Sequence, residues 1–136
     1  MTYIERAIGI DLGTTNSEIA MLEPSERDIL VYQDKFKRRT VPSAVAWDPQ
    51  REDFVVGRDA RKRRGRESAP VESIKRKMGR DERVAVGPHR LSPEEVSAKI
   101  LGELASRMQG FLQQRAGDEV EVAELVRQTQ AHGVLA

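Results

Sequence analysis

A turn after the first apolar run constrains the fold more than any other feature of this sequence. Residues 7–11 read A-I-G-I-D, and the residues that follow, L-G-T-T-N-S, are typical of a turn. Two further runs, 18–22 and 28–32, have the composition of strands. Strands this close in sequence pair antiparallel, because a parallel pair needs a long crossover. The sequence therefore predicts that the chain opens as an antiparallel meander with Gly13-Thr14-Thr15 at its first corner.

Two short strands and a basic segment are expected next. Residues 45–47 and 53–56 have strand-like composition. The segment 58–80 that follows carries ten Lys or Arg against three acids. Because Pro70 lies within this segment and cannot continue a helix, we expect broken helices and a surface loop there.

A capped helix is the clearest element of the second half. In Ser92-Pro93-Glu94-Glu95 the serine is a favoured N-cap, the proline suits the first helical position, and Glu95 completes a capping box. Apolar residues then recur at helical spacing, at Val96, Ile100, Leu104, Met108, Phe111 and Leu112. These signals predict a helix over 93–115 that stops near Gly117 and lays its apolar stripe on a sheet. A strand is expected over 119–123.

Composition narrows the possible functions. Charged residues make up 33% of the 136 residues, yet the formal net charge is only +1, which argues against a dedicated nucleic-acid binder. The absence of cysteine excludes a disulfide scaffold, a thiolate metal site and a cysteine nucleophile. His89 and His132 lack carboxylates at ligand spacing, so we expect both on the surface. Without a secretory signal or a membrane-length apolar run, a cytoplasmic protein with no membrane partner is expected.

The first turn also has the residues that a phosphate group requires. Successive backbone N–H groups in a tight turn form an anion nest, and Gly13 lets the backbone approach a ligand closely. Thr14 and Thr15 add hydroxyl donors, and Asp11 can hold magnesium directly or through its waters. An ordinary hairpin turn uses the same residue types, so this motif alone leaves both interpretations open. The sequence contains neither a P-loop nor a dinucleotide-binding fingerprint.

Four ordered segments resemble one family. I-G-I-D-L-G-T-T-N-S is similar to the first phosphate motif of the actin-like ATPases, and in particular of the seventy-kilodalton heat-shock proteins, the DnaK-type chaperones. Residues 40–45 resemble that family's T-x-P-S segment, and Val56-Gly57 with Ala60 and Lys62 resembles its V-G-x-x-A-K segment. Residues 73–80 resemble its K-R-x-x-G-R segment, and the helix after Ser92 also falls where the family has one. The resemblance covers roughly residues 4 to 123 and reduces the plain hairpin to a minor alternative.

The resemblance implies a fold and a set of site residues. The expected fold is α/β, of the ribonuclease-H-like, actin-like ATPase type, with a mixed sheet of about five strands and the long helix packed on it. Asp11 would organise Mg²⁺ through its waters, and Lys75 aligns with the lysine that assists γ-phosphate hydrolysis. From the residues alone, Lys75 reads as a solvated lysine in a basic run. The phosphates of ATP or ADP would be cradled by Gly13, Thr14, Thr15 and Asn16, with Arg76 and Thr40 nearby.

The chain departs from the family pattern in its length and its end. We expect an N-terminal subdomain of a chaperone-type nucleotide-binding domain over 1–123 and a divergent tail over 124–136. The second phosphate loop and the adenosine motif of the family are missing, so a truncated domain with weak or absent ATP binding and little or no hydrolysis is expected. In the full-length family, nucleotide state controls binding of unfolded peptides during the stress response, with J-domain cochaperones and nucleotide exchange factors as partners.

Three other functions compete with this interpretation. A fragment of another actin-superfamily phosphotransferase, such as a sugar or acetate kinase, shares the first corner but not the T-V-P-S and K-R-x-x-G-R segments. A nucleic-acid module using 58–80 lacks interleaved aromatic residues, and a solvated basic face explains that segment better. A non-catalytic, stand-alone interaction module remains an alternative. A sheet edge and a helix face left uncovered would also promote self-association.

Overall fold

The computed structural model describes residues 7–22, 29–66 and 69–116. The predicted strand at 119–123, the tail 124–136 and His132 lie outside these described residues. The described residues form two compact units, each assembled from separate stretches of the chain. One unit contains residues 7–11, 18–22, 29–40 and 102–116, and the other contains residues 12–17, 41–66 and 69–101.

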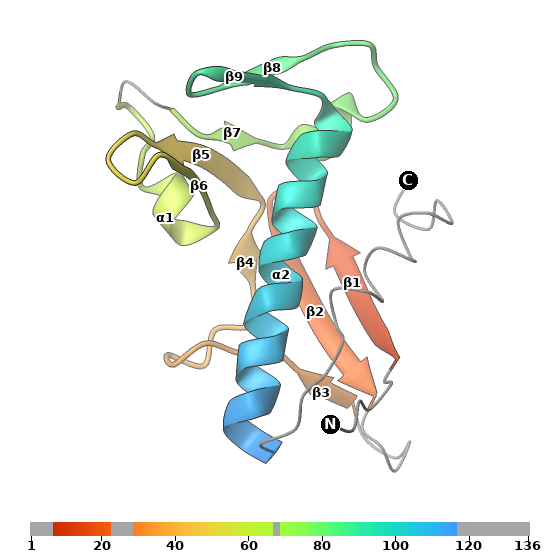
Figure 1. Cartoon of the computed structure of the whole chain (residues 1–136). Helices are drawn as coiled ribbons and strands as arrows, with labels where there is room; N and C mark the ends of the chain where they lie inside the picture. Colours follow the sequence, from red (N-terminus) through yellow and green to blue (C-terminus); the bar gives the residue numbers. More distant parts are fainter. Residues whose placement is uncertain (1–6, 23–28, 67–68, 117–136) are drawn as a thin grey trace, which may run out of the picture. The chain divides into compact units, whose positions relative to one another are not determined.

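The chain opens with the predicted antiparallel meander. Strands β1 (Ile8–Leu12), β2 (Asn16–Leu22) and β3 (Ile29–Val31) lie in that order in one sheet (Figure 1). The N–H of Leu22 donates to the carbonyl of Ala7 at 2.9 Å, and Ala20 lies opposite Val31 in the antiparallel β2–β3 pair. Every second residue of β2 is buried, as expected for a strand with one face on a core. The meander prediction is therefore confirmed.

The single sheet of about five strands is not confirmed. Strand β4 (Val41–Pro42) pairs with β2, and β5 (Ala44–Asp48) lies between β6 (Asp53–Val56) and β7 (Val71–Glu72) in a separate sheet. A two-stranded sheet contains β8 (Val84–Val86) and β9 (His89–Leu91). The N–H of Ser43 donates to the carbonyl of Thr15 and continues the β2–β4 register by one residue, and Ser43 itself lies in a bend between β4 and β5. The chain therefore bends there instead of extending the first sheet.

The basic segment 58–80 contains short helices, as its sequence predicts. Helix α1 (Arg58–Arg61) and the 3₁₀ helix η1 (Ile74–Lys77) are each four residues long. Strand β7 between them was not predicted. Ala60 of α1 forms a fully buried cluster with Ala44 and Ala46 of β5, and such small side chains let a helix lie close to a strand.

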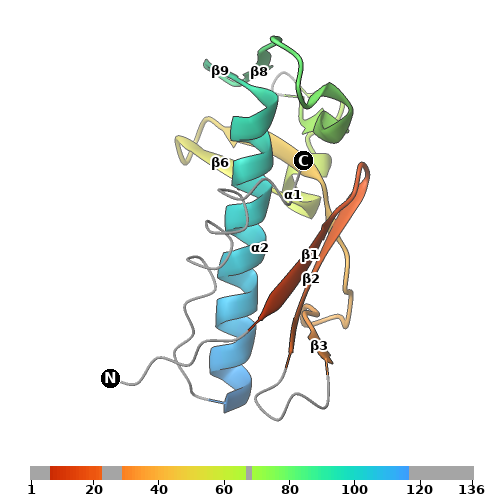
Figure 2. The ribbon, with the colours of Figure 1, turned by 90° about the vertical axis from the view of Figure 1, so that its right-hand side faces the viewer.

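Helix α2 (Pro93–Ala116) begins where the capping box predicts. The N–H of Glu95 donates to Ser92 Oγ at 3.1 Å, and the N–H of Ser92 donates to Glu95 Oε1 at 3.1 Å. The C-terminal half of the helix runs beside the sheet of β1, β2 and β3 (Figure 2), where Phe111 contacts Tyr32 edge to face at 5.7 Å. The predicted apolar stripe is buried at Val96, Ile100, Leu104, Met108 and Leu112. No helix of the described residues is long and apolar enough to cross a membrane.

The only tryptophan lies in an aromatic cluster at the β5–β6 hairpin. Trp47 packs against Phe54 at 5.1 Å and against His89 at 4.8 Å between ring centroids. Lys99 places its ammonium 4.3 Å from the centroid of the Phe54 ring. His89 is exposed, as the sequence predicts, although its ring packs on this cluster. The cluster therefore ties three segments of its unit together.

The start of α2 should make the stability of the protein depend on pH. Hydrogen bonds from the backbone and side chain of Ser92, then the charge of Arg83, hold the pKa of Glu95 below its ordinary value of 4.5. A depressed pKa in the folded state stabilises the fold above the unfolded pKa, and this contribution is lost as pH falls through the folded pKa. We expect the stability difference between wild type and Glu95→Gln to shrink as pH falls below about 4. Glutamine keeps the capping bond, so this difference isolates the charge.

Urea unfolding followed by circular dichroism at several pH values measures this difference. Glu94→Gln in the same helical turn serves as the control, since Glu94 makes no capping bond to Ser92. If the free energies of unfolding of the Glu94 and Glu95 variants change equally over the whole pH range, the capping carboxylate is not the source of the pH dependence.

Candidate functional site

The candidate site is the turn between β1 and β2, which is built around a close approach at Gly13. A Cβ added to Gly13 would lie 2.2 Å from the carbonyl oxygen of Asn16, which is nearer than any real Cβ contact. The φ angle of Gly13 is outside the left-handed region, so the turn requires glycine for space and not for its dihedral freedom. The close approach found at Gly13 is to the chain's own backbone, and the approach of a ligand to this glycine stays a prediction.

Ser43 holds the inner side of this turn. Its Oγ donates to the carbonyl of Gly13 at 2.8 Å and lies 2.8 Å from Ser17 Oγ, while its N–H donates to the carbonyl of Thr15 at 2.9 Å. Both serine side chains are buried. Buried hydrogen bonds of this kind are costly to break because the groups left behind have no water to replace the lost partner. Ser43 therefore fixes the conformation of the turn through the carbonyls of Gly13 and Thr15.

Arg61 holds the same turn from a second direction. Its Nη2 donates to the carbonyl of Thr15 at 2.9 Å, and its Nε forms an ion pair with Glu72 at 3.4 Å. Arg64 also donates to Glu72, at 2.7 Å through its Nε. These hydrogen bonds from Arg64, and the charges of the two arginines, lower the pKa of Glu72. Glu72 thus stays ionised and orients Arg61 toward the turn.

The groups on the outer side of the turn are available to a ligand. Within the described residues, neither the backbone N–H groups nor the hydroxyls of Thr14 and Thr15 have a hydrogen-bond partner. Asp11 is exposed near the end of β1, and its carboxylate has neither a hydrogen bond nor an ion pair in the described part of the chain. Asn16 begins β2 opposite Pro42 and is exposed. N–H and hydroxyl donors of this kind suit a phosphate group, and a carboxylate three residues earlier in the sequence suits a magnesium ion.

Lys75 lies on η1 and is exposed. Its ammonium makes no hydrogen bond or ion pair with any described residue, so the structure does not join it to the turn by a contact. Arg76 beside it is also exposed, and Thr40 is half-buried just before β4. The described residues contain no group of three or more potential metal ligands. A magnesium ion held by Asp11 through water needs no such group, because this cation usually keeps several of its waters.

A pocket of about 560 Å³ lies elsewhere, and none of its lining residues belongs to the turn. It is lined by residues of the loop after β3 and of α2, and it shares no residue with the predicted site. The chemistry of the turn rests on its donors and not on an enclosed cavity.

Comparison with known proteins shows the family of the chain. The family model described as Hsp70 protein matches residues 7–87, which include the turn, Ser43, Arg61 and Lys75. The chain belongs to the Hsp70 family. It is 36% identical to the chaperone protein DnaK of Mycoplasma mobile over 119 residues, and 36% identical to that of Halobacterium salinarum over 121 residues. Each match covers 88% of this chain.

These relatives are much longer than the chain. The two matches cover 18% of each DnaK protein, and so does a third, 39% identical over 109 residues, to DnaK of Thermosipho melanesiensis. The third match covers 79% of this chain. The chain thus corresponds to an N-terminal part of the Hsp70 chaperones and spans less than a fifth of their length.

Ser43 and Arg61 are the site residues that sequence reasoning did not assign. Ser43 lies in the T-V-P-S segment, and Arg61 lies in the V-G-R-D-A-R segment, both of which carried the resemblance. In the structure, each of these segments supplies a hydrogen-bond donor to a carbonyl of the turn. A motif can therefore mark a residue that shapes a site without touching its ligand.

Proposed function

We propose that this chain supplies the first phosphate-binding turn of a chaperone ATPase domain. The observation that carries the proposal is the turn itself, whose carbonyls are held by Ser43 and Arg61 while the donors of Thr14 and Thr15 have no partner in the described part of the chain. Fixed donors need no rearrangement when an anion binds, which is the basis of electrostatic preorganisation. In the whole protein, nucleotide state would control binding of unfolded peptides, with J-domain cochaperones and nucleotide exchange factors as partners.

Each residue has a distinct role in this proposal. Gly13 and Asn16 shape the turn, and the N–H groups and hydroxyls of Thr14 and Thr15 bind the phosphate oxygens of ATP or ADP. Asp11 holds Mg²⁺ through its waters, and bound magnesium neutralises phosphate charge. Lys75 stabilises negative charge at the γ-phosphate, which requires η1 to present its ammonium to the nucleotide.

The affinity of this chain alone should be low. In this proposal the phosphates are bound by the donors of the turn and by magnesium at Asp11, and no described residue makes a hydrogen bond to the Thr14 and Thr15 donors or to the Asp11 carboxylate. A site that covers one side of its ligand leaves the other side to water, where electrostatic interactions are weak. We therefore expect weak binding of Mg²⁺-ATP and little or no hydrolysis by the chain.

Titration of the ¹⁵N-labelled chain with Mg²⁺-ATP, followed by amide chemical shifts, tests the proposal. We expect shifts at Thr14 and Thr15 that are lost in Ser43→Ala, because that variant removes the hydroxyl that donates to the carbonyl of Gly13 and bonds to Ser17 Oγ. Ser97→Ala is the matched control, since Ser97 is buried to the same degree but bonds only to the sulfur of Met78. The proposal would be contradicted if the amide chemical shifts of other residues changed while those of Thr14 and Thr15 did not.

The alternatives give different results in the same titration. Hsp70 membership favours the chaperone over a phosphotransferase. A non-catalytic interaction module would show no nucleotide-dependent shifts in a folded protein. The boundary between a subdomain over 1–123 and a tail over 124–136 is tested by deleting the tail. The amide chemical shifts of residues 1–123 are then compared between the shortened chain and the whole chain. Self-association is tested by light scattering over a range of concentrations.

A further inference from the structure

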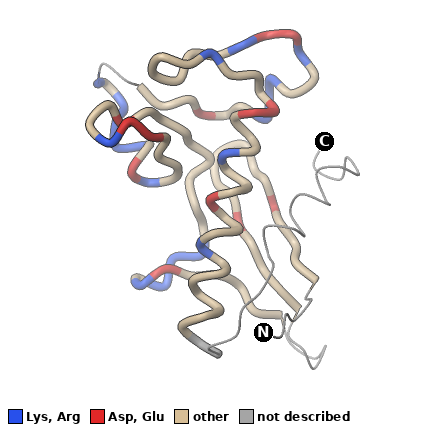
Figure 3. The backbone as a smooth tube through the Cα atoms, in the orientation of Figure 1, with Lys and Arg blue, Asp and Glu red and all other residues tan. Residues whose placement is uncertain are grey.

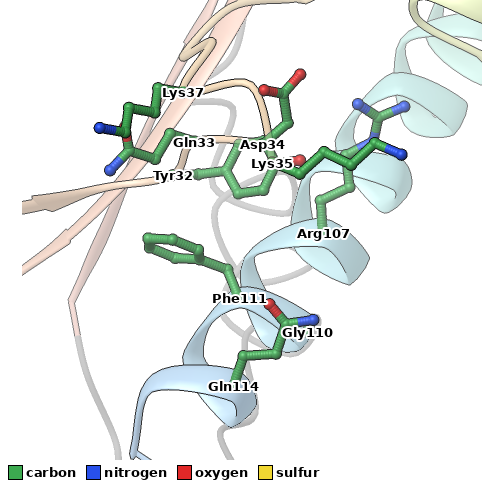
Figure 4. A pocket seen from close by; sticks show the side chains of 9 residues that line it. All are labelled: Tyr32, Gln33, Asp34, Lys35, Lys37, Arg107, Gly110, Phe111 and Gln114. Carbon is green, nitrogen blue, oxygen red and sulfur yellow. The ribbon is translucent and has the colours of Figure 1, made fainter.

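The pocket between the loop after β3 and helix α2 has an aromatic floor and polar walls. Tyr32 and Phe111 meet edge to face there at 5.7 Å, and Tyr32 is buried while Phe111 is half-buried. Figure 4 shows the loop residues on one side and the helix residues on the other. All of them belong to one compact unit. The pocket is lined by Tyr32, Gln33, Asp34, Lys35, Lys37, Arg107, Gly110, Phe111 and Gln114.

The loop at the mouth of the pocket is held in one conformation by Asp34. Its Oδ1 accepts the N–H groups of Phe36 at 2.8 Å and of Arg38 at 2.9 Å, and its Oδ2 accepts Arg38 Nε at 2.7 Å. The N–H of Asp34 donates to the carbonyl of Arg38 at 3.0 Å, which closes the loop. A loop ordered before binding loses little conformational entropy when it binds a partner.

This loop presents an excess of positive charge. The only carboxylate on it, that of Asp34, is neutralised by Arg38, while the ammonium groups of Lys35 and Lys37 make no ion pair with any described residue. Both lysines line the pocket and are exposed, and Figure 3 shows basic residues along the loop between β3 and β4. The ring of Phe36 is 65% exposed beside them. Exposed apolar rings with charged neighbours are typical of interaction sites.

We propose that this pocket, together with the loop Asp34–Arg38, binds an acidic peptide segment that inserts one apolar side chain. The aromatic floor of Tyr32 and Phe111 accepts the apolar side chain, and Lys35 and Lys37 pair with the carboxylates on either side of it. Charge complementarity at the mouth and an apolar interior are the two elements of such recognition.

Single-stranded nucleic acid fits the same loop less well. Lys35 and Arg38 already lie over the Phe36 ring, at 5.2 Å and 4.8 Å from its centroid. A base would have to displace a cation to stack on that ring. A peptide side chain enters the adjacent pocket without disturbing either contact.

Two glycines of α2 give a matched pair of variants. An added Cβ meets nothing within 4 Å at Gly110, which lines the pocket, or at Gly102, which does not line it. Leucine at position 110 takes up space at the wall of the pocket, and leucine at position 102 does not, while both improve the helical propensity of α2. Neither substitution should prevent folding, which circular dichroism of the two variants checks directly.

Fluorescence anisotropy measures binding of a labelled peptide in which one phenylalanine is flanked by aspartates. We expect Gly110→Leu to weaken binding by about tenfold or more and Gly102→Leu to leave it unchanged. Lys37→Glu should weaken it similarly, whereas Lys62→Glu, at an exposed lysine that is not in the pocket, should have little effect. A peptide with lysines in place of the aspartates should not bind.

Three outcomes would overturn the proposal. Equal binding by Gly110→Leu and Gly102→Leu would exclude the pocket, and equal binding of the acidic and basic peptides would exclude the charge pairing. Binding of single-stranded oligothymidylate in the absence of peptide binding would assign the loop to nucleic acid. The phosphate turn shares no residue with the pocket, so both proposals stand or fall separately.

Discussion

Replacement of Gly13 by alanine is expected to lower the free energy of unfolding by about 3 kcal/mol. The new Cβ would lie 2.2 Å from the carbonyl oxygen of Asn16, and this neighbour is backbone that cannot rotate away. The turn must open, and three hydrogen bonds to its carbonyls are stretched or lost as it does: one from the hydroxyl of Ser43, one from the N–H of Ser43 and one from Arg61. Each such bond contributes about 1 kcal/mol net, so three together give the expected loss.

Urea unfolding followed by the fluorescence of Trp47 measures this effect, because the turn and the only tryptophan belong to the same unit. Gly9→Ala is the matched control, since an added Cβ at Gly9 in β1 meets nothing within 4 Å. It should be neutral or slightly stabilising, because alanine loses less backbone entropy on folding than glycine. A Gly13→Ala variant as stable as Gly9→Ala would show that the turn tolerates opening.

The sequence predicts the features of this fold that depend on near neighbours. The antiparallel meander follows from strands too close to cross over, and the start of α2 follows from Ser92 and Glu95, which bond to each other within one helical turn. The donors proposed to bind phosphate are likewise contiguous, at Thr14 and Thr15. Local chemistry is enough to predict such features, because every partner lies within a few residues of the others.

The remaining features depend on partners far apart in the sequence. Ser43 bonds to Gly13 across 30 residues, and Arg61 bonds to Thr15 across 46. No propensity or periodicity indicates these pairs, although the resemblance marked both segments. The pairing of β4 with β2, which ends at the bend at Ser43, likewise joins residues that are far apart in the sequence. Sequence reasoning therefore singled out residues of the turn whose role toward a ligand stays a prediction, and it missed the residues that hold the turn.

Substitution of Gly87 by alanine should destabilise the unit that contains Trp47 by about 3 kcal/mol, because two independent penalties add at this position. Gly87 has a φ of 59°, which is in the left-handed region that disfavours a side chain. An added Cβ would also lie 2.3 Å from Trp47 Cγ and 2.4 Å from Trp47 Cβ. Those atoms are close to the backbone, and packing against Phe54 and His89 holds the indole in place, so a change of rotamer cannot relieve the clash.

Gly65→Ala separates these two penalties, because Gly65 has a φ of 78° but nothing within 4 Å of an added Cβ. It should cost only the backbone penalty, about 1 kcal/mol, and leave the emission spectrum of Trp47 unchanged. Gly87→Ala should cost more and shift that emission, since the indole must move and become more hydrated. If the two variants lose equal stability and Trp47 emission is unchanged in both, the β8–β9 turn does not pack on Trp47 in solution. A larger loss confined to Gly87→Ala would mean that this contact joins the β8–β9 hairpin to the β5–β6 hairpin, and that Trp47 fluorescence reports on both.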